Sequence, residues 1–597
     1  MKKGFKIFTL FLAAVTLLTF VACNSGKNEA DVDTDSGQNE IADTSATYTS
    51  VSETTAALAE RLTDEQKNTV LPSDYVSDVY SITDAGNYYF SGNLTGAITV
   101  AKNAGDVHIY LDGATLSVND DCVISSKAGS NVTITLIGTN SLSNALGSKN
   151  KDKHVIDSKE NLVINGTGTL TIDSTKSAIA CDKTFIGLGG TVNVTAVKHA
   201  VTADSVYIDG LTLNAVSCGK DVIHAESDYD AAETAPTFDF GAGFVYIASG
   251  TINTTAVLGD GIQADSFVYI TGGTFNITTT PTWNNSYVAQ ENQEKGMFNV
   301  SNHQKVARDS VRAGSTYAVL EESVKGIKVG EIDYYLAADE NQENKFTVES
   351  DNYTILIEGG TFNINTVDDA VHANSGSVLA YGGTITINTS DDGIHADKNL
   401  KIAGNANITV ENCYEGIEAE TIDISGGNTT ITALDDGVNA TNANLTESRQ
   451  RQICQINISG GRLDVTVNPN GDRDGIDSNG GIKITGGTVI TRGPNSQNAS
   501  PIDAANAVSV TGGTVIVIGN VPGSSGGAGG FGGPGGRFGG QSEGTFTTNL
   551  TKTQSSSKGL SSGNHTVSVG GEIVAYYNAY TYSGYTTVYA SGKATIN

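Results

Sequence analysis

Hydrophobic and polar residues alternate along most of this chain, in short runs that begin and end at glycine-rich turns. In the run Thr384–Asn388, for example, isoleucine occupies every second position. Alternation with a period of two predicts β-strands with one buried face and one outer face. Most of these runs follow a Gly-Gly pair, which begins at Gly189, Gly272, Gly359, Gly382, Gly426, Gly460, Gly486 and Gly512. The chain is therefore expected to form many short strands joined by tight turns.

A second pattern recurs in phase with the first: a small residue, then Ile or Val, then any residue, then usually Ala. Its central residues are Ile179, Val201, Ile262, Ile327, Val371, Ile394, Ile417, Val438 and Ile476, with weaker copies at Ile124, Ile156, Ile223 and Ile502. From Ile156 the central residue recurs after 23, 22 and 22 residues, and from Val371 after 23, 23 and 21. One such repeat cannot bury its apolar face alone, whereas stacked repeats share a continuous core.

The period and the residue types predict an all-β fold, a right-handed parallel β-helix solenoid with loop insertions. β-Branched residues suit a pleated surface, and Gly and Asn accept the positive φ angles of tight turns. A leucine-rich horseshoe has a similar period, but its Leu-rich consensus with an Asn or Cys ladder is absent from this sequence. Polar insertions at 281–316 and 337–353 are expected to leave the solenoid as loops.

The first residues differ in composition from the rest. Residues 1–22 combine a lysine-containing start with an apolar run too short for a good membrane span, which predicts a lipoprotein signal peptide. They lead into Phe20-Val21-Ala22-Cys23, which resembles a bacterial lipobox and predicts lipidation of Cys23, with an ordinary signal peptide as the alternative. The protein is expected to lie on the extracellular face of the cell membrane, where the lipid anchor alone would hold it.

Composition also suggests the remaining boundaries. Residues 23–64 are rich in Ser, Thr, Asp and Glu and are predicted to be a disordered tether. The β-helix domain is expected at 65–520, a Gly/Ser-rich disordered loop at 521–560, and a C-terminal β-strand cap at 561–597.

The charge balance restricts the possible partners. The formal net charge is −30, and a surface this acidic repels nucleic acid and anionic lipid, so neither is expected as a partner. The chain has 6 cysteines, including Cys23. The other cysteines are irregularly spaced, which does not indicate a framework of disulfide bonds. Most of them are expected to be small buried hydrophobic residues, and the protein is expected to be a monomer.

Two places before the central Ile or Val, many repeats carry an acidic residue. These acids are Asp221, Asp260, Asp369, Asp392, Glu415, Asp436 and Asp474, and Asp368, Asp391 and Asp435 stand one place earlier. In a parallel β-helix, equivalent residues of adjacent repeats lie about 4.8 Å apart. Two carboxylates at that distance repel by about 0.9 kcal/mol in water and by about 3.5 kcal/mol at an effective dielectric constant of about 20. A divalent cation would remove this cost.

Calcium is the cation that this pattern favours, because carboxylate, amide and backbone oxygens are hard ligands. The competing interpretation is that Asp-Gly and Asp-Asp-Gly simply form good turns. A single Asp-Asp-Gly would favour the turn interpretation, whereas an acid in one repeat after another favours metal binding.

One place after the central residue, strand alternation points the side chain outward. The candidate ligand-binding residues at this position are His372, His395, Glu418 and Asn439. Residues of this kind are more often simply solvated. Zinc binding by His372 and His395 is disfavoured, because no third ligand has the spacing of a zinc site. Neutral sugars would instead stack on exposed rings such as Trp283, Tyr381 or Tyr414.

The segments that resemble a known family are Ile82–Gly92, Val107–Gly113, Lys325–Lys328, the Asp-Asp-Gly-Ile-His-Ala repeat at Asp391–Ala396 and the late glycine-rich segment. The chain resembles, from about 70 to 520, a family of bacterial carbohydrate-binding β-helix surface lipoproteins with a pectate-lyase-like fold. Members of that family are associated with cellulose and with acidic sugars such as polygalacturonate. The resemblance implies Ca²⁺ on the repeats. The candidate metal ligands, to which the acidic pattern adds the last, are Asp368, Asp369, Asp391, Asp392, Glu415, Asp435, Asp436 and Asp474.

These observations predict non-catalytic, calcium-dependent binding of plant cell-wall polysaccharide, either polygalacturonate (pectin) or cellulose, at the bacterial cell surface. Because an acidic protein surface repels an acidic polymer, bound Ca²⁺ would bridge the two.

A pectate lyase or polygalacturonase on the same scaffold is the main alternative. Asp391-Asp392 and Asp474–Asp477 superficially match polygalacturonase motifs, but companion Gly-His-Gly and Arg-x-Lys segments are absent from the sequence. A calcium-dependent lyase also needs a base near the metal, for which only Arg462 and Arg473 are plausible. A structural surface adhesin that binds no defined glycan is the third possibility.

Overall fold

The fold is known from a computed structural model, which describes residues 79–119, 121–145, 153–226, 243–279, 324–330, 353–366, 368–442, 445–468, 473–493, 500–519, 545–555, 563–578 and 585–597. All of these residues belong to one compact unit, Leu71–Asn597. The predicted signal peptide 1–22, Cys23 and the tether 23–64 lie outside the described residues. So do the insertion 281–316 and, apart from Tyr353, the insertion 337–353.

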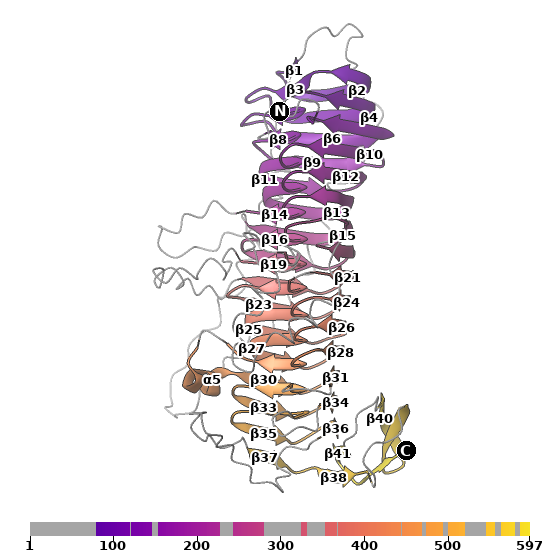
Figure 1. Ribbon diagram of the computed structural model, residues 1–597. Coiled ribbons are helices and arrows are strands. Elements are labelled where there is room, and N and C mark those ends of the chain that lie inside the picture. Colours follow the sequence, from indigo (N-terminus) through magenta and orange to yellow (C-terminus); the bar gives the residue numbers. More distant parts are fainter. Residues whose placement is uncertain are drawn as a thin grey trace, which may run out of the picture. The chain divides into compact units, whose positions relative to one another are not determined.

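The described chain is nearly all β, and almost all of its strands pair in parallel with a counterpart about one repeat away (Figure 1). The pairs form three rows. The first row holds the central Ile or Val of each repeat and contains β1 (Val79–Ile82), β3 (Ala97–Val100), β5 (Ile124–Ser126), β8 (Ile156–Ser158), β11 (Ile179–Gly187), β13 (Val201–Cys218), β14 (Ile223–Ala225), β16 (Ile262–Ala264), β19 (Ile327–Val329), β22 (Val371–Ala373), β25 (Ile394–Ile402), β27 (Ile417–Ile424), β29 (Val438–Ala440) and β32 (Ile476–Ser478).

The second and third rows follow in each repeat, and several long strands contribute to more than one row. The second row also contains β2 (Gly86–Thr95), β4 (Val107–Ser117), β6 (Val132–Ile137), β9 (Leu162–Gly166), β15 (Phe244–Thr254), β17 (Phe267–Ile270), β20 (Thr354–Ile357), β23 (Ser377–Ala380), β30 (Gln455–Ile458), β33 (Gly481–Ile484), β35 (Ala507–Val510) and β37 (Thr545–Thr548). The third row also contains β7 (Thr139–Ser143), β10 (Thr169–Ser174), β12 (Thr191–Ala196), β18 (Thr274–Thr278), β21 (Thr361–Asn365), β24 (Thr384–Thr389), β26 (Asn407–Cys413), β28 (Asn428–Ala433), β31 (Arg462–Val467), β34 (Thr488–Arg492) and β36 (Thr514–Ile518).

One continuous apolar core lies between the rows. It is built from the inward-facing Ile, Val, Leu and Ala side chains of successive repeats, among them the central Ile394 and Ile417. The rings of Phe275 and Phe362, from consecutive strands of the third row, stack with centroids 4.4 Å apart. The cysteines at 122, 181, 218, 413 and 454 are free and buried, as the sequence predicted.

The last described strands differ from the parallel pattern. β41 (Thr586–Ala590) pairs antiparallel with both β36 and β38 (Thr551–Gln554). A separate antiparallel sheet joins β39 (Asn564–Val569), β40 (Glu572–Asn578) and β42 (Ala594–Ile596). The disordered loop predicted at 521–560 needs correction, because its residues 545–555 contain β37 and β38. Their short runs of Thr and Phe find paired neighbours that composition alone did not reveal.

A short helix interrupts the described strands. α5 (Glu447–Ile453) has an acid in its first turn and Arg451 in its last, which suits the helix dipole. Because seven residues cannot form a stable helix alone, tertiary contacts must hold it. Arg451 donates a hydrogen bond to the Ala505 carbonyl, and Gln450 accepts one from Asn479. Among the described residues, no helix has the length and apolar character needed to cross a membrane.

Candidate ligand and metal sites

The residues two places before each central Ile or Val form one column, which we call the turn column. In chain order it contains Cys122, His154, Ser177, His199, Asp221, Asp260, Lys325, Asp369, Asp392, Glu415, Asp436, Asp474 and Ser500. Backbone hydrogen bonds hold it in register, as when the Gly393 N–H donates to the Glu415 carbonyl and the Gly416 N–H donates to that of Asp436. The sequence interpretation recognised only the acids. Counting every residue at this position would have found His199 and Lys325 as well.

Several carboxylates of this column accept hydrogen bonds from the backbone of the next repeat. The Asp221 Oδ1 accepts the backbone N–H of Asp260 at 2.7 Å, and Asp260 Oδ1 in turn accepts that of Lys325 at 2.6 Å. Asp369 and Asp436 accept the N–H of the next column residue in the same way. A buried N–H without a partner is costly, so this role alone explains part of the recurrence of Asp.

Lys325 neutralises the column at its middle. Its Nζ lies 2.6 Å from Asp368 Oδ2 and 3.7 Å from Asp369 Oδ2, and all three side chains are almost completely buried. Burial alone would raise the pKa of Asp369, but Lys325 and His372 outweigh it and hold that pKa well below its usual range. On the sequence alone, the carboxylates of Asp368 and Asp369 were treated as having no cation beside them. In the structure, Lys325 supplies that cation.

Beyond Lys325 the column consists of acids alone up to Asp474. We call the acids at and around these positions the acidic zone, which contains Asp391, Asp392, Glu415, Glu418, Asp435, Asp436, Asp474 and Asp477. Burial and the charge of Asp369 raise the pKa of Asp392 to about 7. Burial, with the charges of Asp392 and Asp436, raises the pKa of Glu415 to about 8. These carboxylates are thus held close together and resist ionisation.

The most open part of the acidic zone lies at its end. Carboxylate oxygens of Asp474, Asp477 and Asp503 lie within 4.8 Å of one another, and these side chains are partly or fully exposed. Arg473 Nε lies 3.7 Å from Asp435 Oδ1 nearby. Three oxygens that converge at the surface are suited to a hard cation that enters from solvent.

The predicted ligand-binding residues lie side by side but are more covered than strand alternation implied. The His372 and His395 rings stack 4.4 Å apart, and their Nδ1 atoms lie 2.5 and 3.0 Å from Asp369 and Asp392. The His372 side chain is only 6 % exposed, because it folds onto the acid three residues earlier instead of reaching into solvent.

Glu418 and Asn439 continue this position in the next two repeats. The Asn439 amide donates hydrogen bonds to Glu415 at 2.9 Å and to Glu418 at 3.2 Å, and Asn439 is buried. Glu418 also lies 3.6 Å from His395 Nε2. These residues therefore form one polar network with the turn column.

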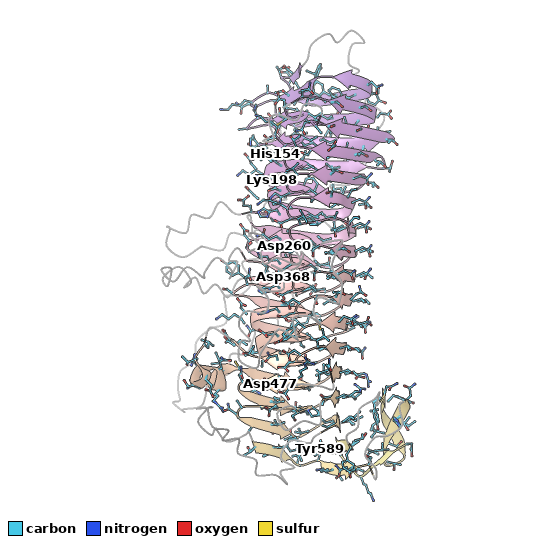
Figure 2. The ribbon with its side chains drawn as sticks, in the orientation of Figure 1. His154, Lys198, Asp260, Asp368, Asp477 and Tyr589 are labelled. Carbon is cyan, nitrogen blue, oxygen red and sulfur yellow. The ribbon has the colours of Figure 1, made fainter. Side chains whose placement is uncertain are left out.

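A row of lysines, which the sequence interpretation missed, occupies the first repeats. We call Lys153, Lys176, Lys198 and Lys220, each three places before a central residue, the lysine row. The Lys198 N–H donates to the Lys176 carbonyl at 2.9 Å, which keeps the row in register. Later repeats carry Asp368, Asp391 and Asp435 at the same position. Figure 2 places Lys198 before Asp368 along the stack, so this position changes from lysine in four successive early repeats to aspartate in most of the later ones, where Tyr414 and Arg473 are the exceptions.

Two members of the lysine row, Lys176 and Lys198, line a cleft of about 770 Å³. Its charged lining includes Lys159, Lys176, Lys183, Lys198, Glu160, Asp182, Asp204 and Glu226, together with His154 and His199. The cleft is thus strongly polar, with positive and negative groups on its walls.

The aromatic side chains differ in whether they could form a platform for sugar stacking. Tyr414 is 2 % exposed and cannot form the sugar platform expected of it. Tyr381 has the Lys401 Nζ 5.6 Å from its ring centroid, and Trp283 lies outside the described residues. An aligned row of Tyr207, Tyr246 and Tyr269, with ring centroids 5.2 and 5.1 Å apart, follows the second row of strands, although each ring is less than one tenth exposed.

Comparison with known proteins gives one match. A family described as carbohydrate-binding domain-containing protein matches residues 77–393 and again residues 383–597. No curated protein and no solved structure shows significant similarity to the chain.

Proposed function

Because this chain belongs to the carbohydrate-binding domain-containing family that matches it from residue 77 to residue 597, we propose that it binds polysaccharide without cleaving it. The observation that carries this proposal is the match itself, which covers all the described strands. The register of the charged columns supports a long ligand, since a polymer laid along the stack would meet the same position of many repeats.

The architecture we propose is a right-handed parallel β-helix with a pectate-lyase-like winding. Three rows of parallel strands, each in register with the strand about one repeat away, support it. Such a stack gives the ligand a repeating surface, because equivalent side chains recur about every 4.8 Å.

Calcium is the cofactor we propose for the acidic zone. The donors there are carboxylate oxygens. Burial, and after it the neighbouring carboxylates, raises the pKa values of Asp392 and Glu415, and a bound divalent cation would favour their ionised form. Asp474 and Asp477, with Asp503 beside them, would hold the most accessible ion. Asp391, Glu415, Asp435 and Asp436 would hold ions further along the column, whereas Lys325 makes Asp368 and Asp369 weaker candidates.

The ligand class we propose is an acidic plant polysaccharide such as polygalacturonate. When bound, Ca²⁺ supplies a positive bridge between the carboxylates of the zone and those of the sugar. The lysine row would add direct ion pairs with the same polymer. For cellulose, the partly exposed ring of Tyr381 is the candidate stacking surface.

A lyase or polygalacturonase remains the competing function. Of the arginines considered as a base, Arg462 lies on β31 in the third row and contacts Asp464 at 2.6 Å. Arg473 contacts Asp435 at 3.7 Å. Both are engaged by carboxylates, which favours binding over catalysis.

We propose that the protein is a monomer and that a lipid on Cys23 holds it on the extracellular face of the membrane. Replacing Cys23→Ala should release the protein from the membrane fraction and abolish its labelling by a fatty-acid probe. Retention of the label would refute this anchor.

The function is tested by depletion of the full-length protein from solution by insoluble polygalacturonate and by cellulose, in Ca²⁺ and in EGTA. We expect EGTA to weaken polygalacturonate binding strongly and to leave cellulose binding largely intact. Release of unsaturated or reducing sugar ends during the assay would establish an enzyme instead. Absence of binding to both polymers in both buffers would favour an adhesin.

A further inference from the structure

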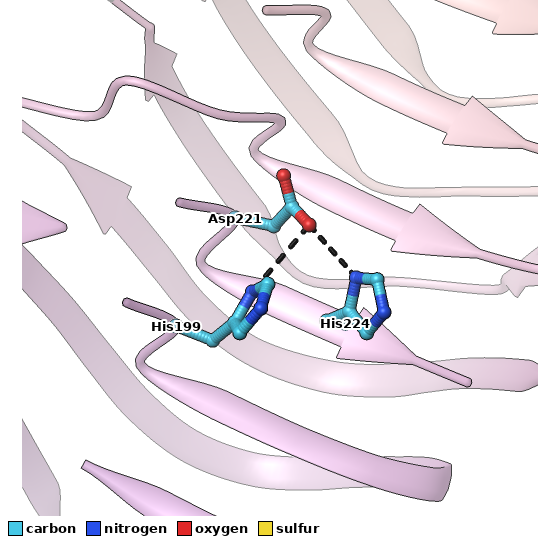
Figure 3. A group of neighbouring side chains, drawn as sticks. All are labelled: His199, Asp221 and His224. Carbon is cyan, nitrogen blue, oxygen red and sulfur yellow. Dashed lines mark hydrogen bonds and ion pairs between the residues drawn. The ribbon is translucent and has the colours of Figure 1, made fainter. Parts of the chain in front are cut away.

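We propose that His199, Asp221 and His224 form a binding site for a divalent cation of the zinc class, separate from the acidic zone. Figure 3 shows both imidazole rings directed at the same carboxylate oxygen. The proposal is independent of calcium and of the polysaccharide proposed above.

The strand register brings the three side chains together. His199 and Asp221 occupy the turn column in consecutive repeats, and the Ala200 N–H donates to the Asp221 carbonyl, which fixes their offset. His224 lies on β14, three residues after Asp221, where its backbone pairs with Thr202 of β13. Rigid strands on both sides therefore position all three groups before any ion binds, as a metal site requires.

The distances suit one small ion. Asp221 Oδ2 lies 2.8 Å from His224 Nδ1 and 3.4 Å from His199 Nδ1. Donors that bind tetrahedral zinc at about 2.0–2.1 Å lie roughly 3.3 Å from one another. The two ring centroids are 4.5 Å apart, and the donor atoms of all three residues fall within 4.8 Å of one another. Small side-chain rotations would thus complete the three-ligand geometry.

The hydrogen bonds of these side chains give an independent indication that a metal ion binds here. The Nδ1 of His199 is fully buried and makes no hydrogen bond, even though it is directed at Asp221. Asp221 Oδ1 is already used by the Asp260 N–H at 2.7 Å, which leaves Oδ2 to serve both rings. A buried nitrogen without a hydrogen bond is costly, and a metal ion at this point would satisfy it.

The surroundings resemble those of bound metal in proteins. Zinc-binding histidines commonly direct their second nitrogen to a carboxylate, and His224 Nε2 lies 3.8 Å from Glu226 Oε2. His199 and Glu226 also line the cleft beside the lysine row, which gives an ion a route from solvent. Side-chain exposures of 13 % for His199 and 17 % for His224 leave room for a water or a ligand carboxylate as a further donor.

The donor set selects the class of ion. Two imidazole nitrogens and one carboxylate suit zinc and its neighbours in the first transition row, whereas calcium takes oxygen ligands almost exclusively. Saturating calcium should therefore leave this site open to zinc.

The test is a Zn²⁺ titration of the full-length protein in millimolar Ca²⁺, with a chromophoric chelator as competitor and Co²⁺ absorption as a second readout. The variants are His199→Gln, His224→Gln and Asp221→Asn, the last of which keeps an oxygen for the Asp260 N–H. Each should weaken Zn²⁺ binding more than about tenfold. The Co²⁺ complex of the wild type should show the visible bands of imidazole coordination, and those bands should disappear in the variants.

Two matched controls are available. His154→Gln alters a histidine of the same column and the same cleft, and His565→Gln alters a histidine of β39, in the separate antiparallel sheet. Both should bind Zn²⁺ like the wild type. Unchanged binding in Asp221→Asn and His199→Gln, or an equal loss in His154→Gln, would overturn the proposal. Thermal unfolding of each variant separates loss of the site from loss of the fold.

Discussion

Lys325 balances the buried charge at the middle of the turn column. Flanking repeats carry Asp260 and Asp369 at its position, yet its ammonium contacts Asp368 at 2.6 Å in a fully buried setting. An intact buried ion pair adds little net stability, but removal of one partner leaves the other charge uncompensated. The lysine is therefore needed because of the acids around it.

Replacing Lys325→Met should lower the free energy of unfolding by about 3–5 kcal/mol, because Asp368 and Asp369 lose their cation. The measurement is urea unfolding at neutral pH. Lys102→Met, at an exposed lysine, should change stability by less than about 0.5 kcal/mol. Addition of Asp368→Asn to the Lys325→Met variant should restore part of the loss. A Lys325→Met protein as stable as the wild type would contradict this account.

The acidic zone should make stability depend on pH in the absence of divalent ions. Glu415 and Asp392 have folded-state pKa values of about 8 and about 7, above the unfolded values of about 4.3 and 3.9. A raised pKa gives stability that is complete below the unfolded value and is lost as the pH rises through the folded value. In EGTA, the melting temperature should therefore fall between about pH 5 and pH 8.

The variant Glu415→Gln should flatten that fall, since its side chain cannot ionise. Added Ca²⁺ should raise the melting temperature more at pH 8 than at pH 5, because it binds the ionised form. A melting temperature that rises over the same range in EGTA would show that the zone ionises without cost.

At the scale of the single element, the close approach of adjacent repeats fixes which residue precedes the central Ile or Val. A Cβ atom at Gly416 would overlap the Gly437 carbonyl oxygen and a methyl group of Ile431. The repeat at β22 accepts Ala370 at the same place, where it is fully buried. The small residue of the sequence pattern is thus a packing requirement between neighbouring repeats.

The variant Gly416→Ala should lose about 1–3 kcal/mol of unfolding free energy through overpacking. Ala370→Gly provides the opposite change at the equivalent position and should cost about 0.5–1 kcal/mol. Both values come from denaturant unfolding with an unchanged slope. Equal stability of Gly416→Ala and the wild type would show that the repeats can separate without cost.

The periodic sequence pattern was sufficient to predict the strands that hold the central residues. β22, β25 and β27 begin at Val371, Ile394 and Ile417 and pair in register, because spacing and burial both repeat. Among the aperiodic features, the sequence predicted strands within 561–597 but neither the short helix nor the strand pairing. α5 depends on contacts such as that of Arg451 with Ala505, and the antiparallel pairing of β41 joins segments far apart in sequence.

The direction of individual side chains also could not be predicted from the sequence. Alternation correctly separates core from outer positions, but it does not show that His372 folds back onto Asp369 or that Lys325 reaches Asp368. These contacts depend on which residue the next winding provides. The lysine row recurs with the same period as the acids and was predictable from the sequence.

At the scale of the whole stack, the position beside the turn column changes from lysine in four early repeats to aspartate in most of the later ones. An acidic polymer would meet direct counter-charges at one end and, in our proposal, calcium at the other. Direct ion pairs at an exposed surface are screened by salt, whereas ions bound by several carboxylates are held more firmly. The two contributions can therefore be separated.

Charge reversal of the lysine row by Lys176→Glu with Lys198→Glu should abolish the polygalacturonate binding that remains in EGTA at low salt. The control pair Lys102→Glu with Lys483→Glu introduces the same charge at exposed lysines elsewhere. Binding isotherms at increasing NaCl give the measurement. An equal effect of both pairs would mean that only net charge matters.

The most direct test of the central claim is the affinity for polygalacturonate, in Ca²⁺ and in EGTA, of the wild type and of Asp474→Asn/Asp477→Asn/Asp503→Asn. The control Asp106→Asn/Glu411→Gln/Glu447→Gln removes the same charge at exposed sites. We predict that the wild type and the control lose at least about tenfold in affinity in EGTA, and that the acidic-zone variant binds weakly in both buffers. A wild type that binds equally well in both buffers would contradict calcium bridging, and so would a variant that keeps the full response to Ca²⁺.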